Sequence, residues 1–278
     1  MYFNNYDVVH AYSIALEFPE GLMVGGSEQH SNFLRLERRG DGRPVLRGTS
    51  VAGVLRHLLA ERKHYSPELL DQYFGWALDE GADRGNSSLV FHDVPFADAC
   101  LVSMHNQIDR NLGSVDTEHG GLFEIERIAP GSKGFLVFFL QSYADREDQD
   151  KTVLADLEGA FAGGLVFGGN SNRGMGRAVV PNNSIRYECF DLRKAEDTRR
   201  YLDVLYSYDP DKEASFGQRR QLTVPADTAD KLLHLEVTFH IPRGQDLLIA
   251  DGRAMVPQRA QRASDNKEYW KIPGSSLR

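Results

Sequence analysis

The chain has 278 residues, of which 41% are hydrophobic and 26% charged, and its formal net charge at pH 7 is −8. It contains no run of roughly 18 apolar residues and no basic-then-apolar start, so we expect neither a membrane span nor a secretion signal. Its two cysteines, Cys100 and Cys189, exclude a disulfide framework and a four-thiolate zinc site, and a reduced cytoplasm is the expected compartment.

The positive charge is concentrated in one stretch. Between Arg35 and Lys63 there are eight basic residues and three acidic ones, whereas acidic residues gather elsewhere, as in 143–150. A basic stripe on an acidic body suits a protein with one defined groove for a polyanion. A solvated charged surface explains such a cluster about as well.

The first half of the chain alternates between strand and helix patterns. Residues 8–18 alternate as a strand that ends at a proline and a glycine. A helix is predicted over 48–63, and a shorter one over 66–78 with Ser66 as its cap and proline at its first position. Residues 87–102 are strand-like.

The second half continues the alternation. Two strands, 121–130 and 133–143, flank a Pro-Gly turn, and an amphipathic helix over 153–164 ends at a double glycine. A glycine-rich turn follows, and 176–180 leaves it as a strand. This order predicts an α+β, ferredoxin-like (RRM-like) layer with a long polar insertion around 100–121.

The end of the chain repeats its beginning. Residues 233–278 resemble the first strand, loop and helix start, with Gly274-Ser275-Ser276 in the place of Gly48-Thr49-Ser50. We therefore expect a first domain at 1–185, a linker with a helix near Arg193–Tyr206 at 186–230, and the start of a second, truncated unit at 231–278. We expect either a fragment of a longer two-copy protein, which we favour, or a C-terminal strip that packs on something else.

Two motifs are candidates for binding an anion. The helix start at Gly48, Thr49 and Ser50 offers free backbone N–H groups, with Arg56 two turns on. An ordinary helix cap is the competing interpretation. The turn 168–177 has four glycines and two arginines but lacks the lysine of a nucleotide-binding loop. It suits an extended phosphate backbone, or else it is a tight turn with solvated arginines.

Together the segments 44–56 and 168–180 resemble those of the RAMP superfamily, and 108–131 is similar to its middle segment. These are ferredoxin-like backbone proteins of type III CRISPR effector complexes. The resemblance implies a RAMP domain with a β-hairpin insertion called the thumb, here about 105–121, and the start of a second RAMP unit. Two units on one chain resemble the fused III-D and III-E proteins most.

The resemblance also implies partners and site residues. The partners are CRISPR RNA, target single-stranded RNA and other RAMP subunits, with no membrane. The residues expected to bind RNA are Gly48, Thr49, Ser50, Arg56, His105, Arg110, Gly168, Gly169, Asn172, Arg173, Gly174, Gly176 and Arg177.

In active family members a loop aspartate supports metal-dependent cutting of target RNA. The first loop, 25–43, departs from that pattern, because it has no aspartate early and offers Glu28 instead. The corresponding loop of the second unit, before Gly274, contains more aspartates, so Asp251 and Asp265 are the better catalytic candidates. If cleavage occurs, a divalent metal, Mg²⁺ or Mn²⁺, is expected as cofactor; otherwise none is. Turn-forming aspartates are the competing interpretation.

Two other functions stay open. One is an autonomous CRISPR RNA-processing endoribonuclease of the same fold, for which His57 or His30 is the available histidine. The other is an RRM-like single-strand binder, which would need aromatic side chains for stacking on the central strands.

Overall fold

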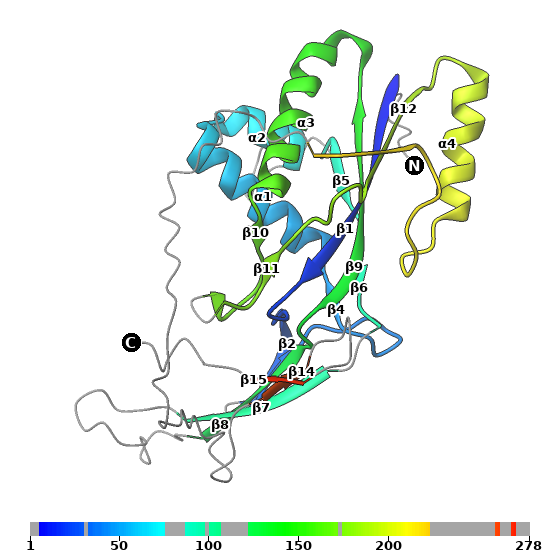
Figure 1. The fold of residues 1–278 in the computed structure, drawn as a ribbon. Helices are drawn as coiled ribbons and strands as arrows, with labels where there is room; N and C mark the ends of the chain where they lie inside the picture. The colour runs from blue at the N-terminus through cyan, green and yellow to red at the C-terminus, as the bar shows by residue number, and fades with distance from the viewer. Residues whose placement is uncertain are drawn as a thin grey trace, which may run out of the picture.

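The computed structural model describes residues 6–30, 33–75, 87–97, 100–106, 122–171, 174–222, 259–261 and 268–270. Its centre is an antiparallel sheet in the order β13-β12-β1-β9-β5, shown in Figure 1. The strands are β1 (Val8–Phe18), β5 (Leu89–Phe91), β9 (Ser132–Ser142), β12 (Ile185–Asp191) and β13 (Gln218–Arg220).

The connections give the sheet a ferredoxin-like topology. β1 leads through α1 (Gly48–Lys63) and α2 (Pro67–Phe74) to β5, and β9 leads through η1 (Ala144–Arg146) and α3 (Glu147–Ala162) to β12. β1 therefore lies between β9 and β12, with Phe18 opposite Ser132 and Val8 opposite Asp191. The expected α+β, ferredoxin-like fold is confirmed.

The two faces of the sheet bury different residues because successive side chains on a strand point in opposite directions. Ile14, Leu16 and Phe18 of β1 face the α1 and α3 side, where they join Leu55 and Leu157 in the main core. Burying each such side chain stabilises the fold by roughly 1.5–3 kcal/mol.

The opposite face is covered by α4 (Ala195–Ser207), which lies on the other side of the sheet from α1 and α3 in Figure 1. Val9 and Phe139 from this face pack in a second cluster with Tyr201 and Val204 of α4. An RRM-like binder would need exposed aromatic rings here. This face is occupied by the protein itself, so the described fold does not support that function.

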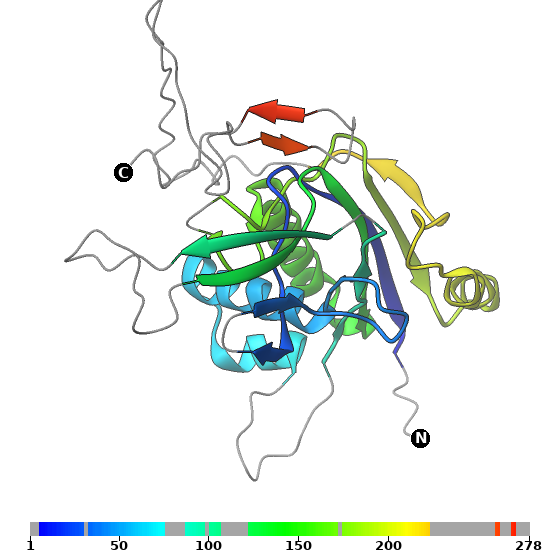
Figure 2. The ribbon, with the colours of Figure 1, turned by 90° about the horizontal axis from the view of Figure 1, so that it is seen from below.

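A second sheet lies at the end of the molecule that Figure 2 faces. Its order is β2-β3-β8-β7, and β7 and β8 form a long antiparallel pair. A short pair, β4 with β6, leads into α1. The bounds are β2 (Gly25–His30), β3 (Phe33–Leu36), β4 (Val45–Leu46), β6 (Val94–Pro95), β7 (Cys100–Asn106) and β8 (Leu122–Ile128).

The strand expected at 176–180 is shorter than predicted, and the segment contacts the end of β1 through an isolated antiparallel bridge between Val179 and Glu17. Arg177–Ala178 is β11, which pairs only with β10 (Leu165–Val166) among the described strands. The strand that pairs with Val8–Ile14 of β1 is β12, most of which lies in the segment 186–230 that was expected to be a linker. The helix expected in that segment, near Arg193–Tyr206, is α4.

α3 begins six residues earlier than the predicted 153–164. Glu147, Asp148 and Asp150 occupy its first turn, where carboxylates favour the helix because its N-terminus carries partial positive charge.

The segment expected to begin a second unit, 231–278, lies mostly outside the described residues. Within it, β14 (Arg259–Gln261) pairs with β15 (Glu268–Trp270). None of the helices in the described ranges has the length and apolar character needed to cross a membrane.

Candidate functional site

The glycine-rich turn connects β10 to β11 and packs on the segment that follows β1. The Gly169 N–H donates to the Met23 carbonyl and the Gly176 N–H to the Gly21 carbonyl, both at 2.9 Å. These bonds fix the turn by its backbone and leave Gly169, Gly174 and Arg177 exposed. The expected residues Asn172 and Arg173 lie outside the described residues.

Two glycines of this turn are required by geometry. Gly168 has φ 72°, and a Cβ there would lie 2.0 Å from the Met23 carbonyl oxygen. Gly176 has φ 82°, and its Cβ would lie 1.9 Å from the Phe167 oxygen. Any larger residue would both strain the backbone and collide with it. The glycines therefore build the turn, whatever ligand it binds.

The start of α1 is arranged around a carboxylate of the protein. The Gly48 N–H donates to Asp93 Oδ1 at 2.8 Å, and Arg47 donates to Asp93 Oδ2 at 2.9 Å and to Glu37. Thr49 and Ser50 remain exposed. Sequence reasoning missed Asp93 as a partner of this helix start; its place in the short connection between β5 and β6 was the available signal. An incoming anion would meet this carboxylate.

The turn and the helix start are linked through one short stretch. Met23 accepts the hydrogen bond from the turn, the next residue, Val24, accepts one from the Glu37 N–H at 2.9 Å, and Glu37 pairs with Arg47. The two motifs expected to bind RNA thus flank residues 21–24, beyond the end of β1.

Arg56 is directed into the fold. It forms an ion pair with Asp71 of α2 and donates to the Gly75 carbonyl at 2.6 Å. The structure therefore places its guanidinium against α2 and does not bring it to the α1 start.

Most of the basic stretch is internally paired. In the described part of the chain, Arg38, Arg43, Arg47, Arg56 and Lys63 each form an ion pair with a carboxylate. Arg35 lies over the Phe33 ring at 5.1 Å. The expected basic stripe is therefore largely neutralised by neighbouring acids.

The expected thumb begins as the β7–β8 pair. His105, near the end of β7, stacks on Phe123 at 5.6 Å between ring centroids, and Ser103 Oγ lies 2.9 Å from its Nε2. Arg110 and the rest of the connection, 107–121, lie outside the described residues.

The side chains of the three expected catalytic carboxylates, Glu28, Asp251 and Asp265, are not among those that the structure describes. Glu28 lies in β2, where only its backbone is placed, and Asp251 and Asp265 lie outside the described residues. Among the described residues, no three His, Cys, Asp or Glu side chains are arranged to hold a metal ion.

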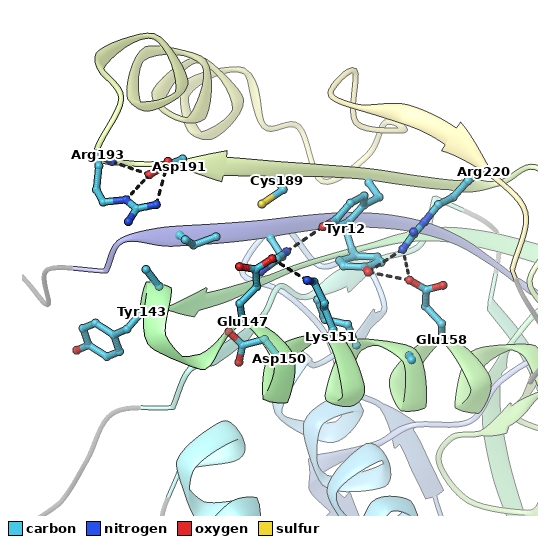
Figure 3. A pocket seen from close by; sticks show the side chains of 16 residues that line it. Tyr12, Tyr143, Glu147, Asp150, Lys151, Glu158, Cys189, Asp191, Arg193 and Arg220 are labelled. Atoms are coloured by element: carbon cyan, nitrogen blue, oxygen red, sulfur yellow. Dashed lines mark hydrogen bonds and ion pairs between the residues drawn. The ribbon is translucent and has the colours of Figure 1, made fainter.

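A pocket of about 610 Å³ lies elsewhere, between α3 and the β1–β12 edge (Figure 3). Arg220 and Glu158 meet there beside Tyr12, whose phenol donates to Glu158 at 2.7 Å. The Arg220 guanidinium lies 4.3 Å from the Tyr187 ring centroid. The cations that line this pocket are thus engaged with its acids and rings.

Burial favours the neutral forms of three groups in this pocket, His10, Tyr187 and Cys189. Burial lowers the pKa of His10 and raises the pKa of the Cys189 thiol. Burial also raises the pKa of Tyr187 to about 12. These shifts disfavour a thiolate or imidazolium, so no activated nucleophile arises from these residues.

Comparison with known proteins gives one family. The model of the RAMP superfamily matches residues 18–179, which is more than half of the chain. No curated protein matches. Two solved structures share 12% identity and a TM-score of 0.49: the type III-B Cmr-beta bound to cognate target RNA, matched over 64% of this chain and 96% of that chain, and its apo state, over 62% and 96%.

Proposed function

Because the chain belongs to the RAMP superfamily, we propose that it is a CRISPR RNA-binding backbone subunit of a type III effector complex. The observation that carries the proposal is the family match itself. It spans α1, the β7–β8 hairpin and the glycine-rich turn, the segments on which the resemblance places RNA binding. The partners proposed with it are the guide RNA, a target RNA and other RAMP subunits, in an arrangement like that of the fused III-D and III-E proteins.

The way the sheet is covered supports a site at its end. In the described part of the chain, helices α1 and α3 cover one face of the central sheet and α4 covers the other. The glycine-rich turn and the α1 start lie beyond the end of β1. Their exposed residues include Ser50, Gly169 and Arg177. A phosphate backbone following this end would meet the exposed residues Thr49 and Ser50 and the arginine Arg177.

The direct test is co-expression of the full chain with the other subunits and a CRISPR array, followed by sequencing of the RNA that co-purifies. Guide RNAs bound in stoichiometric amounts are expected. The competing function predicts a different result: the purified chain alone would cut repeat RNA without metal, and His57→Ala or His30→Ala would abolish the cut. That result would overturn the proposal.

For target-RNA cleavage, the proposal assigns Asp251 or Asp265, with Glu28 as the weaker candidate. Carboxylate oxygens are the ligands that Mg²⁺ and Mn²⁺ prefer, and such an ion would supply charge neutralisation at the cut phosphate. Assembled complexes carrying Asp251→Asn, Asp265→Asn or Glu28→Gln should be compared for cleavage and for binding of complementary RNA. Loss of cutting with binding retained identifies the residue; unchanged cutting in all three excludes the assignment.

A further inference from the structure

Arg127 lies on β8 beside the segment that holds the glycine-rich turn. It shares a strand face with Ile125, which packs against Met23 and Met175 of that segment and turn. The neighbouring residue, Ile128, forms a bridge to Leu22, with its N–H 2.8 Å from the Leu22 carbonyl. The backbone of β8 is thus fixed next to residues 21–24.

The guanidinium of Arg127 is incompletely satisfied. Its Nε is fully buried and has no hydrogen-bond partner in the part of the chain that the structure describes. Burial lowers the pKa of Arg127, and the acid that opposes this effect is Glu20. A buried donor attached to a charged group is costly unless a partner is supplied.

Other arginines of the described chain form ion pairs or hydrogen bonds with neighbouring side chains. Arg38 pairs with Glu126, the residue next to Arg127 in sequence. Arg220 also has a buried Nε without a partner, but its Nη2 is bound by Glu158 and Tyr12. No comparable side-chain hydrogen bond involves Arg127 among the described residues. Within the described part of the chain, most basic groups are paired and Arg127 has no such partner.

The side of the glycine-rich turn is one from which a partner can approach the other guanidinium nitrogens of Arg127. Glu20, which acts on Arg127 electrostatically, also lies close to the turn, since a Cβ on Gly174 would be 4.0 Å from its Cγ. Arg127 keeps partial exposure, so an external group can reach the guanidinium. A phosphate diester carries the charge and the acceptor oxygens that a guanidinium binds best.

We infer that Arg127 is a phosphate-binding residue, which donates from its guanidinium to a backbone phosphate of RNA lying against the glycine-rich turn. This inference rests on the proposed function and adds to it a contact that lies outside both expected motifs. Because the contact is to phosphate, it is independent of base sequence.

The test uses the full chain and its assembled complex, with a fluorescein-labelled oligouridine as probe. Arg127→Met removes the charge at similar length, Arg127→Lys keeps it, and Arg199→Met removes the same charge from the exposed side of α4 as a control. Affinity is measured by anisotropy over a salt series, and the thermal midpoint is measured without RNA.

Three results are expected together. Arg127→Met weakens binding about tenfold and lowers the slope of log K against log salt by about 0.7, the value for one phosphate contact to a single strand. Its thermal midpoint stays equal or rises, because an unpaired buried donor has been removed. Arg127→Lys falls between the wild type and Arg127→Met, and Arg199→Met behaves as the wild type.

Each contrary result has one meaning. Unchanged affinity and slope in Arg127→Met, with normal binding by the wild type, would overturn this inference alone. Weaker binding with a lower midpoint and an unchanged slope would make Arg127 a structural residue and overturn it as well. Failure of the wild-type chain and complex to bind RNA would overturn the proposed function and, with it, the inference.

Discussion

Tyr73 of α2 donates a hydrogen bond of 2.7 Å to the carboxylate of Asp150 on α3, and both side chains are 1% exposed. The bond therefore joins two helices that cover the same face of the sheet. Hydrogen bonds to buried charged groups contribute more than neutral ones, because the charge is costly to leave without a partner.

Removing that hydroxyl should destabilise the fold. Tyr73→Phe keeps the ring and leaves the buried carboxylate without its donor, so we expect the free energy of unfolding to fall by about 2 kcal/mol. Urea denaturation measures it. Tyr206→Phe is the matched control, since Tyr206 is 87% exposed and its change should be within about 0.5 kcal/mol. Equal effects of the two variants would show that the Tyr73–Asp150 bond contributes nothing specific.

Gly176 should tolerate no side chain. With φ 82° and a Cβ 1.9 Å from the Phe167 oxygen, Gly176→Ala should destabilise the protein by about 2 kcal/mol or more. Gly53→Ala is the control, because Gly53 lies within α1 with nothing within 4 Å of its Cβ. That variant should be more stable by up to about 1 kcal/mol. Thermal unfolding that ranks the two in the opposite order would contradict the geometry of the turn.

The arginines of the turn should contribute to RNA affinity through charge. Arg173→Ala combined with Arg177→Ala should weaken guide binding and lower the salt slope by about 1.4, or about 0.7 for each phosphate contact. The pair Arg199→Ala and Lys212→Ala makes the same change in net charge on and near α4. If this control changes the slope equally, the effect comes from net charge alone and the turn is not a phosphate site.

Asp93 should weaken RNA binding at the α1 start. Its carboxylate accepts from Gly48 N–H and pairs with Arg47, so it competes with a phosphate for the same donors. Asp93→Asn keeps an acceptor oxygen and removes the charge. Affinity for single-stranded RNA should rise about threefold, as expected for one charge at a helix terminus. An unchanged affinity would show that RNA does not approach this helix start, and a loss of affinity would contradict the competition.

Stability should fall on mild acidification. Burial lowers the pKa of His10 and His92 from 6.5. The carboxylates of Asp150 and Glu147 partly raise the pKa of His10 again, and the charge of Lys151 lowers it further. The carboxylate of Asp93 partly raises the pKa of His92. The unfolded chain therefore binds protons more readily, and stability is complete above about pH 6.5 and decreases as the pH falls through the folded pKa values.

The urea midpoint, measured from roughly pH 7.5 to pH 5.5, should show this decrease in the wild type. The variant His10→Gln with His92→Gln should show a smaller decrease. His57→Gln, at an exposed position of α1, serves as control and should follow the wild type. An identical pH dependence in all three proteins would assign the effect to other groups.

The sequence predicted the elements whose signals are local. β1 and α1 have the expected bounds, because alternation and helix spacing are visible within their own residues. β12 was missed because Ile185–Asp191 carries polar residues on both faces, and its strand character depends on pairing with β1 from far along the chain. The early start of α3 was missed because its acidic first turn was interpreted only as surface charge.

The motifs of the site could be predicted from the sequence, but the residues that contact those motifs could not. The glycines of the turn signalled unusual backbone geometry, yet nothing local indicated that Gly21 and Met23 would hold it. The same is true of Asp93 at the α1 start and of Arg56, which pairs with Asp71 instead of facing a ligand. These contacts arise from tertiary packing, which a one-dimensional pattern does not contain.

The position of β1 in the sheet also determines the order of events during synthesis. β1 is made first, but its two neighbours are Ser132–Ser142 and Ile185–Asp191. At roughly 5–20 residues per second, an apolar strand with two unpaired edges waits on the order of ten seconds for its partners. During that interval its unpaired edges can pair with another nascent chain. The yield of folded protein should therefore depend on translation speed and on chaperones that bind the first strand.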